Sequence, residues 1–165
     1  MSDALAIKPH DLAAGEISGW RGRCLDLFAR GERIIDAVLE VAGDLDPALT
    51  MKHLAGQRIA DLRKLASAEK GASEKQKLAV LACLERWQAV HSKRAFFAHG
   101  IVTVLIDKQA GWHVQFDFTR YQGKQRDRQR WSISNQEAMR FEQELAHETH
   151  VLSAQLGQFR KRLAL

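Results

Sequence analysis

One predicted helix carries two polar side chains on the stripe that its apolar residues define. Val80, Leu84 and Trp87 recur at helical spacing, and the next positions of the same stripe are His91 and Arg94. An uncompensated guanidinium on a buried stripe is unfavourable, because the charge loses its hydration. We therefore expect this end of the helix to face a pocket, a subunit interface or a charged partner.

A second group of polar residues lies on a predicted strand. Arg126, Arg128 and Arg130 alternate along the chain and so share one face of that strand, and Lys124 extends the row. Clustered arginines on a strand can bind successive phosphates of a nucleic-acid backbone. The same pattern also suits an edge strand, on which charge prevents pairing with other sheets. Both interpretations are open at this point.

The segment 94–100 reads RAFFAHG and resembles the Arg-x4-6-His motif of the HEPN superfamily (higher eukaryote and prokaryote nucleotide-binding domains). Members are small and often dimeric helical bundles, and many are metal-independent ribonucleases of toxin–antitoxin or defence systems. The resemblance is strongest over residues 73–100. It implies that Arg94 binds the scissile phosphate and that His99 acts as general acid or base, leaving a cyclic phosphate. It further implies a homodimer, RNA or another polyanion as ligand, and an antitoxin protein as partner.

One departure from the family pattern supports a second hypothesis. Active members usually carry a polar residue directly after the arginine, whereas this chain has Ala95. The same scaffold without catalysis would serve as a regulatory or interaction module. A third hypothesis is an unrelated dimeric bundle that binds a small ligand near Trp87 and His91.

Structural roles are open alternatives for both motif residues. Arg94 would form an ion pair with an acid on a neighbouring helix. His99 would end its helix ahead of a left-handed Gly100, where a cation interacts favourably with the helix dipole. The same spacing also occurs at two other places in the chain, from Arg86 to His91 and from Arg140 to His147.

Composition and charge exclude several classes of protein. The 165 residues are 45% hydrophobic and 27% charged, which is too apolar for intrinsic disorder. No apolar run reaches the roughly 18 residues of a membrane span, and the N-terminal residues lack a secretory pattern, so we expect a cytoplasmic protein. Residues 1–71 hold 10 basic and 11 acidic residues, whereas residues 72–165 hold 15 and 9. This basic second half favours a polyanionic partner.

We expect neither a cofactor nor a metal. Cys24 and Cys83 lie beside apolar residues in helical patterns and are expected to be buried and reduced. Glu144 and His147 share a helix face, but a di-iron bundle needs a second such pair and two further glutamates. The chain contains no Walker A or Gly-x-Gly-x-x-Gly pattern.

The hydrophobic periodicity predicts a mainly helical α+β chain forming a single domain over residues 1–165. Helical spacing predicts helices at about 16–42, 48–66 and 73–99. The period then changes to two, which predicts an antiparallel three-stranded meander at about 101–106, 112–118 and 126–133. A capping box from Ser134 to Glu137 starts a final helix at about 135–163. The expected fold is a HEPN-like helical bundle with this meander inserted before the long C-terminal helix.

Overall fold

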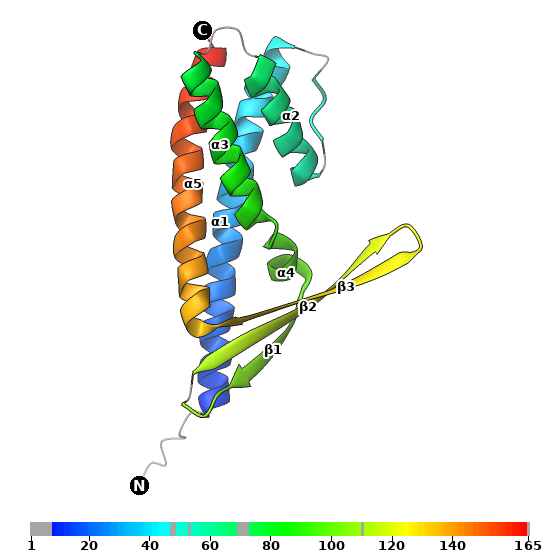
Figure 1. Ribbon diagram of the computed structural model, residues 1–165, viewed down its shortest axis with the longest axis vertical. Helices are drawn as coiled ribbons and strands as arrows, with labels where there is room; N and C mark the ends of the chain where they lie inside the picture. Colours follow the sequence, from blue (N-terminus) through cyan, green and yellow to red (C-terminus); the bar gives the residue numbers. More distant parts are fainter. Residues whose placement is uncertain (1–7, 47–48, 53, 69–72, 110, 165) are drawn as a thin grey trace. The chain divides into compact units, whose positions relative to one another are not determined.

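The computed structural model describes residues 8–46, 49–52, 54–68, 73–109 and 111–164 (Figure 1). Its elements in chain order are α1 (Pro9–Leu45), α2 (Ala55–Ala68), α3 (Glu74–His91), α4 (Arg94–His99), β1 (Ile101–Ile106), β2 (Trp112–Gln122), β3 (Gln125–Ser134) and α5 (Asn135–Leu163). The mainly helical α+β class is confirmed. So is the antiparallel sheet placed directly before the long C-terminal helix.

The chain forms two compact units, and both long helices run through both of them. The first unit comprises residues 1–25 and 93–143, and the second comprises residues 26–92 and 144–165. The unit boundary therefore crosses α1 and α5 within their helical spans. The single domain expected from the sequence stays a prediction.

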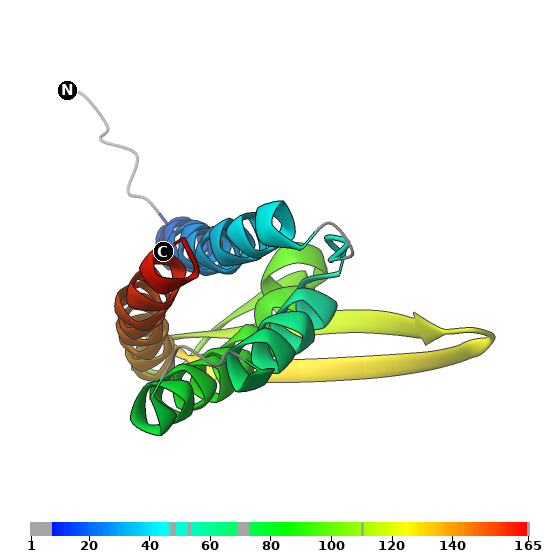
Figure 2. The same cartoon turned by 90° about the horizontal axis from the view of Figure 1, so that it is seen from above.

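The second unit is a helical bundle in which α1, α3 and α5 run side by side (Figure 2). One close approach on α1 shapes its core, since a Cβ atom added at Gly31 would lie 2.2 Å from the indole of Trp87. Glycine is needed here because it leaves room for this ring. Phe28 packs edge-on against Trp87, with 6.2 Å between ring centroids. Other fully buried side chains of this unit are Ile35, Val38, Ile59, Leu62, Leu84, Leu145, Leu152 and Leu156.

The first unit packs one face of its sheet against helices through a cluster of aromatic rings. The strand order is β1-β2-β3 with antiparallel neighbours. Phe116 of β2 and Trp131 of β3 stack with 5.5 Å between centroids, and Phe97 of α4 stacks on Phe141 of α5 at 5.6 Å. Trp20 of α1 joins the cluster, 5.0 Å from the ring of Phe97. This apolar contact explains the alternation of apolar and polar residues along β2 and β3.

The single helix expected over residues 73–99 is observed as two helices, α3 and α4. A turn at Ser92 and Lys93 separates them. The hydroxyl of Ser92 donates a hydrogen bond to the carbonyl of Ala89 at 2.6 Å, and such local bonds compete with helix continuation. The Lys93 ammonium lies 5.8 Å from the ring centroid of Phe96 and 5.4 Å from that of Trp131. The break separates the apolar stripe of α3 from the motif residues of α4.

Candidate nucleic-acid interface

The β2–β3 hairpin is longer than the sequence pattern predicts. Its register runs from His113 opposite Ser134 to Gln122 opposite Gln125, so β2 continues past residue 118. Gly123, with a φ of +59°, and Lys124 form the turn. A positive φ at the first central position is what tight two-residue hairpin turns require, and glycine adopts it without strain. The end of the hairpin projects away from the other elements of the first unit (Figure 1).

The register places the predicted arginine row on the side of the hairpin opposite the aromatic cluster. Residues directly opposite in an antiparallel pair project to the same face. Phe116 and Trp131 are one such pair on the buried face. On the other face the opposite pairs are Arg126–Tyr121, Arg128–Thr119 and Arg130–Asp117. We call Lys124, Arg126, Arg128 and Tyr121 the arginine face.

Arg130 is left out of this definition because it is held by a partner in its own sheet. Its Nε donates a hydrogen bond to Oδ1 of Asp117 at 2.9 Å. This bond is the main reason why the pKa of Asp117 lies below its ordinary value. The side chains of Arg126 and Arg128 are exposed and form no hydrogen bond or ion pair with a described residue, although the charge of Arg128 also helps to lower the pKa of Asp117. Two of the three arginines therefore offer their guanidinium groups to a ligand.

Tyr121 is a candidate binding residue that the sequence reasoning missed. Its side chain is 69% exposed, and Arg126 lies directly opposite it. Proteins that bind single-stranded nucleic acid combine such aromatic surfaces with cations that follow the backbone. The strand expected at 112–118 leaves Tyr121 in a loop. Assigning Gly123 to a two-residue turn would have extended both strands and revealed the pairing.

Both motif residues lie on α4, at opposite ends. Arg94 is the first residue of this helix and its Nε is buried, whereas His99 is the last residue and is exposed. The imidazole of His99 stacks on Phe118 with 6.1 Å between centroids and 27° between planes. Five steps along an ideal helix turn through about 500°, which leaves the two side chains roughly 140° apart. The helix itself therefore does not bring the two side chains to one face.

Gly100 ends α4 in a different way from the left-handed cap considered above. Its φ and ψ are −71° and 137°, which is extended backbone. A Cβ atom at this position would lie 2.4 Å from the carbonyl oxygen of Phe96 and 3.2 Å from a ring atom of Phe116. Glycine is needed for close packing of the chain rather than for a positive φ. His99 still lies in the last turn, so the structural alternative for a cation there stands.

His91, predicted to bind substrate, lies in the second unit and is held by neighbours there. Its Nε2 is 2.9 Å from Oε1 of Glu32, and the two side chains are 14% and 16% exposed. Its ring also contacts Phe28 and Trp87, with centroid distances of 5.9 and 5.8 Å. These contacts give His91 a structural role in the bundle. Its part in substrate binding stays a prediction.

The two other arginine–histidine spacings have simpler explanations. Arg86 donates from Nε to Oε2 of Glu148 at 3.1 Å, which accounts for one of them as an ion pair within the second unit. Arg140 and His147 are exposed on α5. Neither pair contains an arginine whose Nε is buried as that of Arg94 is.

The two cysteines are buried, as the sequence predicts. Cys24 and Cys83 are 0% and 1% exposed, and burial raises the pKa of their thiols to about 12 and about 11. Among the described residues, no group of three or more His, Cys, Asp or Glu is arranged to hold a metal ion. Within the same residues, no helix combines the length and the apolar character needed to cross a membrane.

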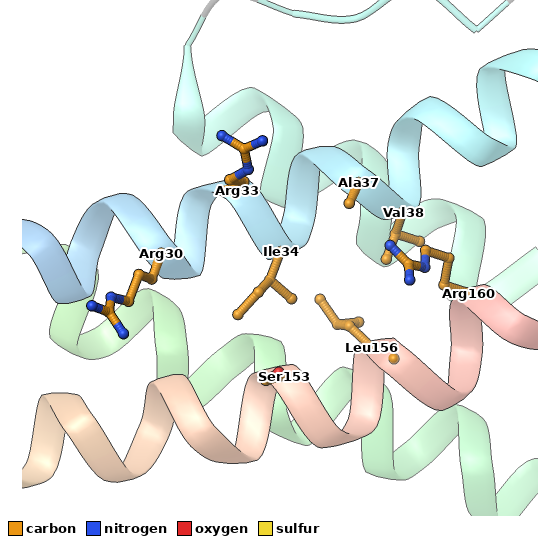
Figure 3. A pocket seen from close by; sticks show the side chains of 9 residues that line it. Arg30, Arg33, Ile34, Ala37, Val38, Ser153, Leu156 and Arg160 are labelled. Atoms are coloured by element: carbon orange, nitrogen blue, oxygen red, sulfur yellow. The ribbon is translucent and has the colours of Figure 1, made fainter.

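A groove in the second unit is lined by residues of two helices. It has a volume of about 430 Å³ and lies between α1 and α5. Ile34 and Leu156 point toward one another across it (Figure 3). Arg30, Arg33 and Arg160 also line it. These residues differ from the Trp87 and His91 region where the third hypothesis expects a ligand.

Comparison with known proteins adds no assignment: no family model, curated protein or solved structure matches the chain. The resemblance of residues 73–100 to the HEPN superfamily therefore stays an expectation.

Proposed function

We propose that the chain binds RNA, or another nucleotide-containing polyanion, through the arginine face. The observation that carries this proposal is the exposed ring of Tyr121 directly opposite Arg126, with Arg128 two residues farther along the same face. Cations supply attraction to phosphates without regard to sequence, and an exposed ring supplies a surface on which a base can stack. The alternative, protection of an edge strand, accounts for the charges but not for the exposed aromatic ring.

The same proposal assigns Arg94 and His99 to metal-independent cleavage of the bound RNA. The ribose 2′-oxygen would attack phosphorus and the bond to the 5′-oxygen would break, leaving a 2′,3′-cyclic phosphate and a 5′-hydroxyl. His99 would accept the proton of the 2′-hydroxyl or donate one to the leaving oxygen, and Arg94 would bind the phosphate. Because the two side chains leave α4 about 140° apart, a homodimer would combine Arg94 of one copy with His99 of the other. A ribonuclease of this kind would act as a toxin or defence protein held in check by an antitoxin.

Two alternative functions would be distinguished by the same experiments. A regulatory module without catalysis is favoured by Ala95, since the position after Arg94 lacks the polar side chain of active family members. A small-ligand bundle is favoured by the groove between α1 and α5, whose apolar walls and three arginines suit an anionic ligand with an apolar part. The small-ligand bundle does not predict RNA binding through the hairpin, and the regulatory module does not predict cleavage of bound RNA.

The binding test measures affinity for a fluorescently labelled single-stranded RNA over a series of salt concentrations. The variant Arg126→Glu/Arg128→Glu removes two phosphate contacts, so the slope of log K against log salt should become shallower by about 1.4. Arg140→Glu is the matched control, since this exposed arginine lies on α5 of the same unit. Tyr121→Ala should weaken binding without changing the slope. Equal slopes for the wild type and the double variant would refute the proposed surface.

The cleavage test incubates the protein with mixed RNA in excess chelator and identifies the ends of the products. The wild type should leave cyclic phosphates, and Arg94→Ala and His99→Ala should each abolish cleavage. His147→Ala is the control for loss of an exposed histidine. Tight RNA binding with no cleavage by the wild type would reject the catalytic assignment and support the regulatory module.

A further inference from the structure

β1 is an edge strand, and no other described strand pairs with the edge that faces away from β2. It lies at one end of the order β1-β2-β3, and its backbone hydrogen-bonds only with β2 among the described residues. An open edge presents unpaired N–H and C=O groups that readily pair with another strand. Its sequence is IVTVLI, without charge, proline or glycine. The opposite edge strand, β3, carries Arg126, Arg128 and Arg130, and charges on an edge strand disfavour pairing with another sheet.

The outer face of β1 also exposes two large apolar side chains. Ile101 is 74% exposed and Leu105 is 48% exposed, with Thr103 between them on the same face. Ile101 lies opposite Asp117 of β2, so this face is continuous with the one that carries the arginine row. A neutral, β-branched edge with exposed Ile and Leu is the pattern that invites pairing with a further strand.

We infer that β1 pairs with β1 of a second copy of this chain, antiparallel across a two-fold axis, to form a six-stranded sheet. A two-fold axis perpendicular to the sheet relates each face of one copy to the same face of the other. Residues opposite one another in the pair project to the same face, and side chains alternate between faces along a strand. The two residue numbers in each opposite pair therefore add to an even number. Two registers use most of the strand, one centred on Thr103 and the other on Val104.

The register centred on Thr103 fits the side chains better. It places Ile101 opposite Leu105 of the partner subunit, and by symmetry Leu105 opposite the partner's Ile101. Both exposed apolar side chains of the outer face thus gain an apolar neighbour, whereas Ile106, 37% exposed on the inner face, lies beyond the paired residues. Val102 lies opposite Val104 of the partner subunit on the inner face. The register centred on Val104 would leave Ile101 unpaired and place Thr103 opposite a leucine.

This self-complementarity is the reason for naming a second copy rather than another protein. One neutral strand supplies both partners of every pair, and no charge has to be matched. The inference does not depend on RNA binding, because the arginine face lies on β3, β2 and their turn. A dimer that fails to bind RNA and a monomer that binds it are therefore distinguishable outcomes.

The first experiment uses a cysteine at the proposed two-fold axis. Opposite Cα atoms of an antiparallel pair lie about 4.5–5.5 Å apart, which is within the range of a disulfide. Thr103→Cys adds an exposed thiol to a chain whose Cys24 and Cys83 are buried. Mild oxidation should convert this variant to a cross-linked dimer on a non-reducing gel. Ser132→Cys, exposed on β3, is the control and should stay monomeric; equal cross-linking of the two variants would overturn the inference.

The second experiment measures mass in solution by light scattering. The wild type should have the mass of two 18.6-kDa chains, and Ile101→Lys/Leu105→Lys should have the mass of one. Met139→Lys, which changes another exposed apolar residue of the first unit, should remain a dimer. A monomeric wild type at about 100 μM, or a double variant that still dimerises, would refute the pairing. If the double variant does not fold, the comparison of the two cysteine variants decides.

Discussion

Replacing Gly31 with alanine tests the close packing of the second unit. The added Cβ would lie 2.2 Å from two atoms of the Trp87 ring and 2.9 Å from a third. Carbon atoms in contact are normally about 3.5–4.0 Å apart, so the ring or the helix has to move by more than about 1 Å. Trp87 is fully buried and contacts Phe28 and His91, which leaves its ring little room to move.

The expected change in the free energy of unfolding combines two opposing terms. Overpacking a core usually destabilises by about 1–3 kcal/mol, and this overlap belongs at or above the upper end of that range. Alanine in place of glycine within a helix stabilises by about 1 kcal/mol. We therefore expect Gly31→Ala to lower stability by about 2 kcal/mol. Gly22→Ala on the same helix meets nothing within 4 Å and should raise stability by about 0.5–1 kcal/mol.

Urea denaturation followed by circular dichroism measures both changes from the transition midpoints. The clash is then isolated by repeating Gly31→Ala in a Trp87→Phe background, where the smaller ring leaves space for the methyl group. The penalty of Gly31→Ala should fall by more than about 1 kcal/mol in that background. The reasoning is refuted if Gly31→Ala costs the same in both backgrounds, or if it matches Gly22→Ala.

Three further predictions follow from the contacts described above. The backbone N–H and the hydroxyl of Ser134 lower the pKa of Glu137. The ionised carboxylate therefore contributes stability above its ordinary pKa, and this contribution is lost as the pH falls through the lowered value. In acid denaturation, the stability of Glu137→Gln should decline less steeply with pH than that of the wild type. The thiols of Cys24 and Cys83 should react with a thiol reagent at pH 8 only after unfolding, because they are buried and their pKa values are raised to about 12 and about 11. Gly100→Ala should destabilise by about 1–3 kcal/mol in the same urea assay, because its Cβ would lie 2.4 Å from a carbonyl oxygen.

The parts of the fold that follow from local periodicity were predictable from the sequence. The alternation of Trp131 and Ile133 with arginines predicts which face of β3 is buried. The structure confirms this face, because Ile133 is buried and the ring of Trp131 stacks on Phe116. The capping box at Ser134 correctly indicates where α5 begins, because its hydrogen bonds join residues three apart in sequence. α1 begins at Pro9, earlier than the expected residue 16, and α2 begins at Ala55 rather than near residue 48.

The candidate site depends on features that the local pattern does not contain. The helix break at Ser92 and Lys93 involves residues that helices tolerate, so the apolar stripe gives no sign of it. The pairing of Arg130 with Asp117 and of Arg126 with Tyr121 depends on the register of the hairpin, which its turn determines. Residue types alone therefore identify a basic strand, but they do not show which of its arginines forms an ion pair within the sheet.

The division of the aromatic residues between the units gives the protein a built-in set of optical probes. Three of the four tryptophans lie in the first unit, and Trp87 is the single tryptophan of the second. Trp87→Phe would leave tryptophan emission from the first unit only, and the difference between the wild type and this variant would report on Trp87 in the second unit. Comparing the unfolding curve of the variant with that of the difference would show whether both units unfold in one cooperative transition.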